Sequence, residues 1–162
     1  MWIALLTRPD IANAVRVVAR YCSAPKLIHW KAALGILGYA VRTSSFGITF
    51  PRGTVEGFHL VSFADADYAS KATDRRSVSG GVVMCAGGPV SWYSKTQKCV
   101  TLSTTQAEYV AMSDVAKEIL RQVWRFMLPR GGMPCIPLFE DNEGAIQIAK
   151  HPISNSNSKN ID

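Results

Sequence analysis

The strongest helical pattern in the chain covers residues 104–128, which read TTQAEYVAMSDVAKEILRQVWRFML. Apolar residues recur every four positions along this stretch and form one stripe, made of Ala107, Ala111, Val115, Ile119, Val123 and Met127. This period predicts an amphipathic helix with one buried face. Two overlapping capping-box patterns mark its start, at Ser103-x-x-Gln106 and Thr105-x-x-Glu108.

Short β-prone stretches lie on both sides of this helix. Those before it are Phe58–Ala64, Val78–Cys85, Val90–Ser94 and Cys99–Leu102. Because three of these strands follow one another with turn residues between them, they predict an antiparallel meander. After the helix come a predicted strand at Cys135–Glu140 and a short helix at Asn142–Lys150. The expected fold class is therefore α/β, with a mixed sheet of three antiparallel strands followed by helix, strand and helix.

Residues 1–57 form a different, helical region. Apolar residues at helical spacing predict one helix over residues 10–22 and a second over 28–42, which we expect to pack together. This region holds seven Lys/Arg and two Asp/Glu, whereas residues 58–162 hold eleven and ten. Most of the net charge of +6 is thus N-terminal. A phosphate-rich partner fits this charge, and so does a soluble basic surface without a specific partner.

Composition excludes several classes of protein. Hydrophobic residues make up 48% and charged residues 19%, which is unlike an intrinsically disordered chain. No apolar run approaches the roughly 18–20 residues of a membrane span, so no membrane partner is expected. The run Met1–Leu6 is too short for a signal peptide, which favours an intracellular protein. The four cysteines form no CxxC pair, so we expect buried thiols and no zinc site.

Three acidic residues stand at the ends of predicted elements. Asp65 follows the first strand, Glu108 lies in the first turn of the long helix, and Asp141 ends the strand after it. In a small mixed sheet these ends can converge. A cluster of carboxylates is what metal-dependent phosphodiester cleavage needs, because hard oxygen ligands hold Mg²⁺ and paired ions activate water and stabilise the leaving oxygen.

Each of these residues also has a simpler interpretation. Asp65 could be an acid at a solvated strand end. Glu108 could be only the capping-box partner of Thr105. Asp141 or Asn142 could simply cap the short helix that follows. Spacing alone leaves these alternatives open.

Five ordered motifs run along the chain from Ala64 to Lys150. They are Ala64–Ala69 (ADADYA), Asp74–Gly80 (DRRSVSG), Pro89–Trp92 with Ser94, Lys95 and Gln97, Leu102–Tyr109 (LSTTQAEY), and Asp141-Asn142 with Ala145-Ile146 and Ala149-Lys150. Together they resemble the ribonuclease H domain of copia-type retrotransposon polyproteins. The N-terminal region resembles the end of the reverse transcriptase of the same polyproteins, at Thr7–Ile11, Ala14-Val15, His29-Trp30 and Leu37-Gly38-Tyr39.

The resemblance implies a domain organisation and a fold. Residues 1–57 would be a two-helix C-terminal remnant of the reverse transcriptase. Residues 58–162 would be a ribonuclease H-like domain that lacks its last strand and helix, which carry the fourth carboxylate in that family. The chain departs from the family pattern at Ser70, where glycine is usual, and at Asn160, where histidine is usual.

The resemblance also implies an activity, namely hydrolysis of the RNA strand of RNA–DNA hybrids with Mg²⁺ or Mn²⁺. Asp65, Glu108 and Asp141 would be the catalytic metal ligands. Arg75 and Arg76 would contact phosphates, although a solvated hairpin explains them equally well. The implied partners are the hybrid and the remainder of the polyprotein, in the cytoplasm or in virus-like particles. The alternative is a catalytically inactive remnant of a degenerate element that at most binds nucleic acid weakly.

Overall fold

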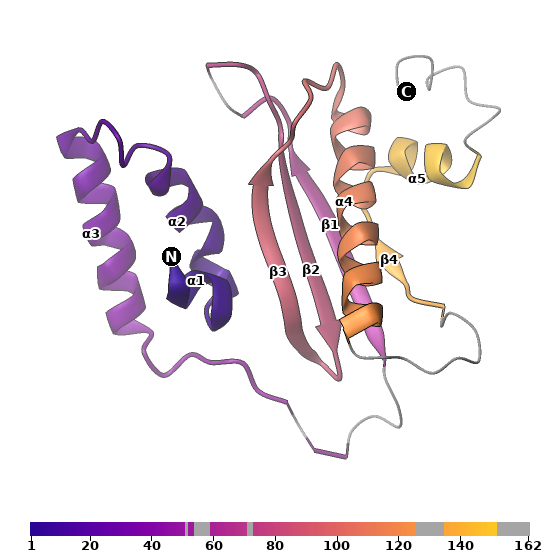
Figure 1. Ribbon diagram of the computed structural model, residues 1–162, viewed down its shortest axis with the longest axis horizontal. Helices are drawn as coiled ribbons and strands as arrows, with labels where there is room; N and C mark the ends of the chain where they lie inside the picture. The colour runs from indigo at the N-terminus through magenta and orange to yellow at the C-terminus, as the bar shows by residue number, and fades with distance from the viewer. Residues whose placement is uncertain (51, 54–58, 71–72, 126–134, 152–162) are drawn as a thin grey trace.

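A four-stranded mixed sheet is the centre of the molecule (Figure 1). The structure is a computed structural model that describes residues 1–50, 52–53, 59–70, 73–125 and 135–151. The strands are β1 (Leu60–Asp67), β2 (Val78–Cys85), β3 (Gly88–Thr96) and β4 (Leu138–Phe139), in the spatial order β3-β2-β1-β4. The first three pair antiparallel and β4 pairs parallel to β1. The predicted α/β class and the antiparallel meander are confirmed.

The hairpin between β2 and β3 turns over only two residues. Cys85 pairs with Gly88, and the residues between them, Ala86 and Gly87, have φ angles of 50° and 79°. Two successive left-handed residues give the tight turn whose twist matches that of the strands. The predicted bounds of β2 are confirmed, whereas β3 is longer than predicted.

Three further strand predictions are wrong in whole or in part. Residues 99–102 form no strand, because they pair with no described strand; Thr101 is buried and shares a hydrogen bond with the Ser77 hydroxyl (Oγ1 to Oγ, 2.8 Å). The predicted strand Cys135–Glu140 pairs with β1 only at Leu138 and Phe139. In the opposite sense, β1 continues past Ala64 to Asp67.

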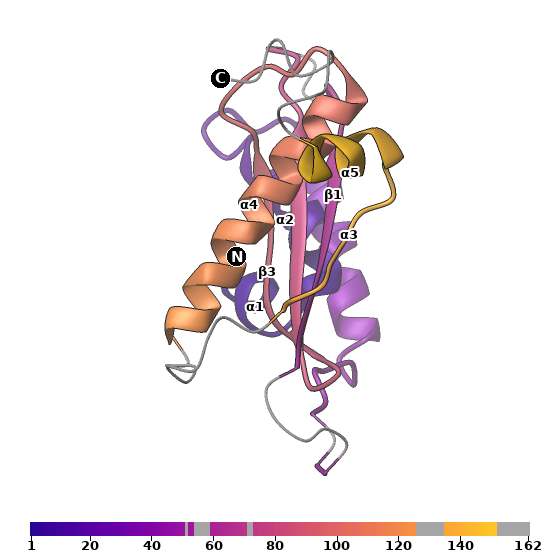
Figure 2. The ribbon, with the colours of Figure 1, turned by 90° about the vertical axis from the view of Figure 1, so that its right-hand side faces the viewer.

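The core lies between the sheet and helix α4 (Thr104–Arg125), which crosses one face (Figure 2). Leu60 and Val83 of the sheet pack against Val115 and Ile119 of the helix. This confirms the predicted buried stripe over its described part. Helix α5 (Glu143–Lys150) packs beside α4, and its Ala145 and Ile148 are buried.

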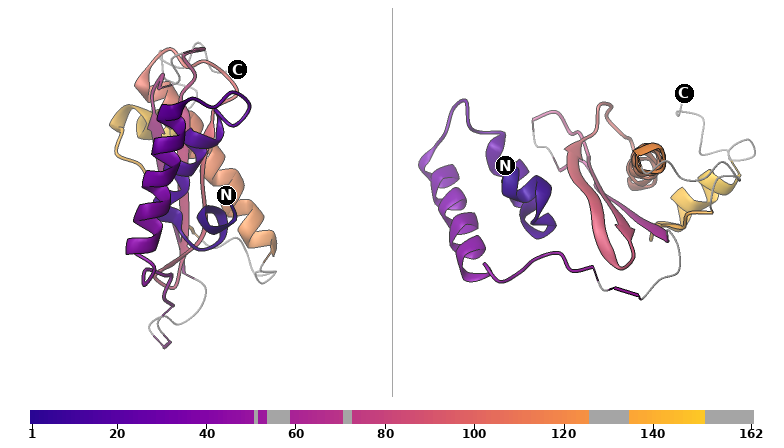
Figure 3. Two further views of the ribbon diagram at one scale, coloured as in Figure 1. Left: turned by 90° about the vertical axis from the view of Figure 1, so that its left-hand side faces the viewer. Right: turned by 60° about the horizontal axis from the view of Figure 1, so that its bottom comes forward.

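The N-terminal helices cover the opposite face of the sheet (Figure 3). They are α1 (Trp2–Leu6), the 3₁₀ turn Pro9–Ile11, α2 (Ala12–Ala19) and α3 (Leu27–Arg42). Helix α2 packs against β3, and the Trp92 indole donates a hydrogen bond to the Ala4 carbonyl over 2.7 Å. The two predicted helices are present, but the first is shorter than predicted and α1 was not predicted.

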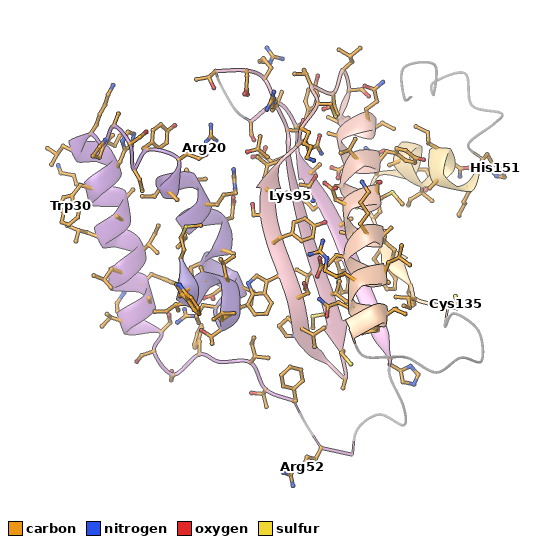
Figure 4. All side chains as sticks on the ribbon, viewed as in Figure 1. Arg20, Trp30, Arg52, Lys95, Cys135 and His151 are labelled. Atoms are coloured by element: carbon orange, nitrogen blue, oxygen red, sulfur yellow. The ribbon has the colours of Figure 1, made fainter. Side chains whose placement is uncertain are left out.

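One apolar side of α3 is exposed, because α2 covers only the other side of that helix; in Figure 4, Trp30 lies on its outer side. The prediction of buried thiols is wrong. Cys22, Cys99 and Cys135 are exposed and Cys85 is half-buried. No described helix is long and apolar enough to cross a membrane. The predictions for Phe58, for Met127 and for residues 152–162 lie outside the described residues, as does the expected boundary between residues 57 and 58.

Candidate metal centre

The ends of β1, β4 and α4 meet at one end of the sheet. Because β4 runs parallel to β1, with Phe63 opposite Phe139, both strands deliver the residues that follow to the same end. Helix α4 runs back across the sheet and its first turn starts at that end (Figure 1). Carboxylates distant in the sequence are thereby gathered. One carboxylate oxygen from each of Glu108, Glu140 and Asp141 lies within 4.8 Å of the other two.

Glu108 is the innermost member of this cluster. It is only 8% exposed, and its Oε2 atom has no hydrogen-bond partner among the described residues. Burial, with smaller effects from the charges of Glu140, Asp65 and Asp141, raises the pKa of Glu108 to about 7, although the Ala66 backbone opposes the shift. At neutral pH this carboxyl group is thus poised between its protonated and ionised forms.

Glu108 is not simply the capping-box partner of Thr105. The Thr105 hydroxyl donates to the Asn142 side-chain oxygen over 3.3 Å. The other predicted capping pattern supplies the bonds at the start of α4, since the Gln106 amide donates to the Ser103 hydroxyl over 3.2 Å. Glu108 is left to face the other carboxylates.

Glu140 and Asp141 are fixed by the start of α5. Asn142 is its N-cap residue, because the Asn142 side chain accepts a hydrogen bond from the Ala145 amide over 3.0 Å. Asp141 is therefore free of that capping role. Glu140 Oε1 accepts from the Asn142 amide over 3.1 Å, and Glu140 Oε2 is buried with no partner among the described residues. Burial, together with Asp141, raises the pKa of Glu140, and the Asn142 hydrogen bond partly offsets that shift.

Asp65 lies beside this group but outside it. The alternation along β1 places Ala64 against the core and Asp65 on the opposite, exposed side. There Asp65 and Asp67 line a cleft of about 280 Å³ between α2 and the sheet. Asp65 is near enough for its charge to contribute to the raised pKa of Glu108. Of the three predicted residues, the structure thus brings Glu108 and Asp141 together and leaves Asp65 next to them.

The predicted phosphate contacts lie in the loop between β1 and β2, at the same end of the sheet. Arg75 is exposed and has a φ angle of 58°. The Arg76 guanidinium lies 3.7 Å from the Asp74 carboxylate, and both side chains are partly exposed. The loop is tied to the segment before α4, since the Ser77 hydroxyl accepts from the Ala69 amide and contacts Thr101.

Glu140 is the residue that sequence reasoning missed. It appeared only as the end of a predicted strand, in the run Phe139-Glu140-Asp141-Asn142. The available signal was two adjacent carboxylates directly after a strand. Since neighbouring residues after a short strand need not alternate strictly between faces, both can reach one site.

Comparisons with known proteins give a family. Over 165 aligned positions the chain is 37% identical to a retrovirus-related Pol polyprotein from transposon TNT 1-94 of Nicotiana tabacum, covering all of this chain and 12% of the polyprotein. It is 32% identical over 157 residues to the corresponding polyprotein from transposon RE2 of Arabidopsis thaliana, covering 96% of this chain and 11% of that protein. The chain thus spans about an eighth or less of these polyproteins.

A shorter relative comes from Plasmopara viticola. The chain is 42% identical over 119 residues to a protein named secreted RxLR effector protein 161, covering 73% of this chain and 82% of the relative. No family model matches the chain, and no solved structure matches it. The resemblance to transposon polyproteins is confirmed at the level of the polyprotein. Along its whole length the chain is homologous to a part of retrovirus-related Pol polyproteins from transposons.

Proposed function

We propose that this chain is the ribonuclease H part of a retrotransposon polyprotein, hydrolysing the RNA strand of RNA–DNA hybrids with a divalent metal. The observation that carries the proposal is Glu108, a buried carboxylate with an unpaired oxygen, facing Glu140 and Asp141. A buried charge without a partner is costly, so this arrangement favours a cation as the missing partner. The sequence motifs around Asp65, Glu108 and Asp141 agree with that assignment.

The residues fit Mg²⁺ or Mn²⁺ by their chemistry. All the available ligand atoms are carboxylate oxygens, which are the ligands that hard divalent cations prefer. Two of these oxygens, on Glu108 and Glu140, are buried and unpaired among the described residues. Glu108, Glu140 and Asp141 would hold the ion, with Asp65 at its side. A bound ion would supply an activated water and would stabilise the charge that develops on the leaving oxygen.

The protein contributes a rigid frame for these carboxylates. Asn142 links them, because its backbone amide holds Glu140, its side chain caps α5, and Thr105 in the first turn of α4 donates to the same side chain. In this proposal Arg75 and Arg76 contact phosphates of the hybrid from the neighbouring loop. Recognition would depend on the shape of the hybrid and on the 2′-hydroxyl groups of the RNA strand.

The test is cleavage of a labelled RNA–DNA hybrid in Mg²⁺ or Mn²⁺ by the full chain. Glu108→Gln and Asp65→Asn should each lower the rate by roughly 100-fold or more, beyond the 10–100-fold typical of residues that only support metal ligands. The matched control is Glu143→Gln, an exposed carboxylate in the first turn of α5. Circular dichroism should show that all the variants are folded.

Two results would contradict the proposal. Metal-dependent cleavage that persists in Glu108→Gln would exclude this cluster as the site. A folded chain that cleaves no hybrid would support the alternative, a catalytically inactive remnant.

A further inference from the structure

Gln97 is a buried polar residue that the proposed chemistry does not use. It follows directly after β3, is only 2% exposed, and is the largest of the fully buried side chains among the described residues. Its backbone amide donates to the Ser77 carbonyl over 2.9 Å. Its side chain therefore starts from a fixed point next to the first turn of α4.

The Gln97 side chain joins β2 to α4. Its Nε2 atom donates to the Ser79 hydroxyl on β2 over 3.0 Å and to the Ala107 carbonyl on α4 over 2.8 Å. Ala107 is fully buried and directly precedes Glu108. The bond thus fixes the first turn of α4 against the sheet at the residue next to the innermost carboxylate.

The arrangement is not the one that core packing alone would favour. Gln97 Oε1 is buried and has no hydrogen-bond partner among the described residues. A buried amide with one unsatisfied atom is unfavourable relative to an apolar side chain of similar shape. An apolar residue could not make the two hydrogen bonds of Nε2. This favours a role for Gln97 in holding α4 in place against the sheet.

We propose that Gln97 is a positioning residue for the metal centre, holding the first turn of α4 so that Glu108 stays within reach of Glu140 and Asp141. This inference rests on the proposed function, because it assigns Gln97 to the same site. The role is that of a second layer around a metal, where partners orient the groups that bind the ion.

Gln122 provides a matched control. It has the same side chain, is 4% exposed, and lies in the same helix, almost four turns after Glu108. Its Nε2 atom donates to Glu118 Oε1 over 2.7 Å, within α4. It is therefore buried and hydrogen-bonded like Gln97, but its bond lies within α4 and away from the carboxylate cluster.

The experiment compares Gln97→Met with Gln122→Met in the full chain, because Met has a similar shape and no amide. Mn²⁺ binding is measured by calorimetry well below the melting temperature of every variant. Both variants should be less stable than the parent chain, because each leaves an acceptor, the Ala107 carbonyl or Glu118 Oε1, without the hydrogen bond from the amide. Only Gln97→Met should bind Mn²⁺ more weakly, by roughly 10–100-fold. Equal Mn²⁺ affinity of Gln97→Met and the parent, or equal losses in the two variants, would overturn the proposal.

Hydrogen exchange separates this inference from the proposed function. With no metal present, the amides of residues 106–109 should exchange faster in Gln97→Met than in the parent chain. In Gln122→Met their exchange rates should equal those of the parent chain. If the parent chain binds no Mn²⁺ and cleaves no hybrid, the proposed function fails, while faster exchange confined to Gln97→Met still supports the positioning of the α4 turn. Unchanged exchange in Gln97→Met would overturn the positioning role whatever the metal result.

Discussion

Helices α4 and α3 have similar apolar patterns and opposite burial. Helix α4 buries Ala107, Ala111, Val115 and Ile119 against the strands. Helix α3 carries an equally regular stripe that stays 47–68% exposed, made of Leu27, Trp30, Leu34, Leu37 and Val41. The spacing of apolar residues therefore predicts a helix and its apolar side. Whether that side is buried depends on another element packing against it. The sheet is the surface against which α4 packs. Among the described residues, no element covers the apolar stripe of α3.

The comparison is tested most strongly by one substitution made in both helices. Val115→Asp places a charge in the fully buried core, which should cost on the order of 4 kcal/mol and unfold much of the protein. Val41→Asp on the exposed stripe of α3 should change the free energy of unfolding by about 0.5 kcal/mol or less. Urea unfolding followed by circular dichroism measures both. Similar losses would mean that the stripe of α3 is buried in solution.

A smaller effect is expected where the N-terminal helices meet the sheet. Trp92→Phe removes the indole hydrogen bond to the Ala4 carbonyl and should cost about 0.5–1.5 kcal/mol. The control is Trp30→Phe, at an exposed position of α3, where almost no change is expected. Unfolding by urea compares the two, and hydrogen exchange should locate the loss in α1. An unchanged exchange pattern in Trp92→Phe would contradict the docking of α1 on β3.

A further expected effect is a dependence of stability on pH at Glu108. The folded-state pKa of about 7 lies above the 4.5 that is ordinary for a glutamate, so the folded chain holds this proton more tightly than the unfolded chain. The stabilisation is therefore complete below about pH 4.5 and is lost as the pH rises to about 7. Without metal, Glu108→Gln should gain stability relative to the parent across this window, and Glu143→Gln should not. A difference between parent and Glu108→Gln that is independent of pH would contradict the burial of this carboxyl.

Most of the strands and helices from β1 to α5 could be predicted from the sequence. Valine-rich β2 and the long stripe of α4 are strong, regular signals. The predicted strand at residues 99–102 is absent because local β-propensity forms no strand without a partner strand to pair with. Helix α1 was missed because five residues are too few to show a helical period.

The candidate site was predictable in part for a related reason. Strand ends and helix starts can be placed from sequence, so Glu108 and Asp141 were found. Glu140 was not, because the sequence does not reveal that β4 pairs at only two positions and leaves both carboxylates free to approach Glu108. The displacement of Asp65 to the α2 side of β1 depends on strand register, which alternation alone leaves undetermined.

The most direct test of the central claim is anomalous diffraction from crystals of the full chain soaked in Mn²⁺, with Glu108→Gln crystals treated identically. The account predicts a manganese peak among the carboxylates of Glu108, Glu140 and Asp141, beside Asp65, that is absent or much weaker in Glu108→Gln. No peak at this place in the parent crystals, or an equal peak in both, would contradict the claim that this cluster is a metal centre.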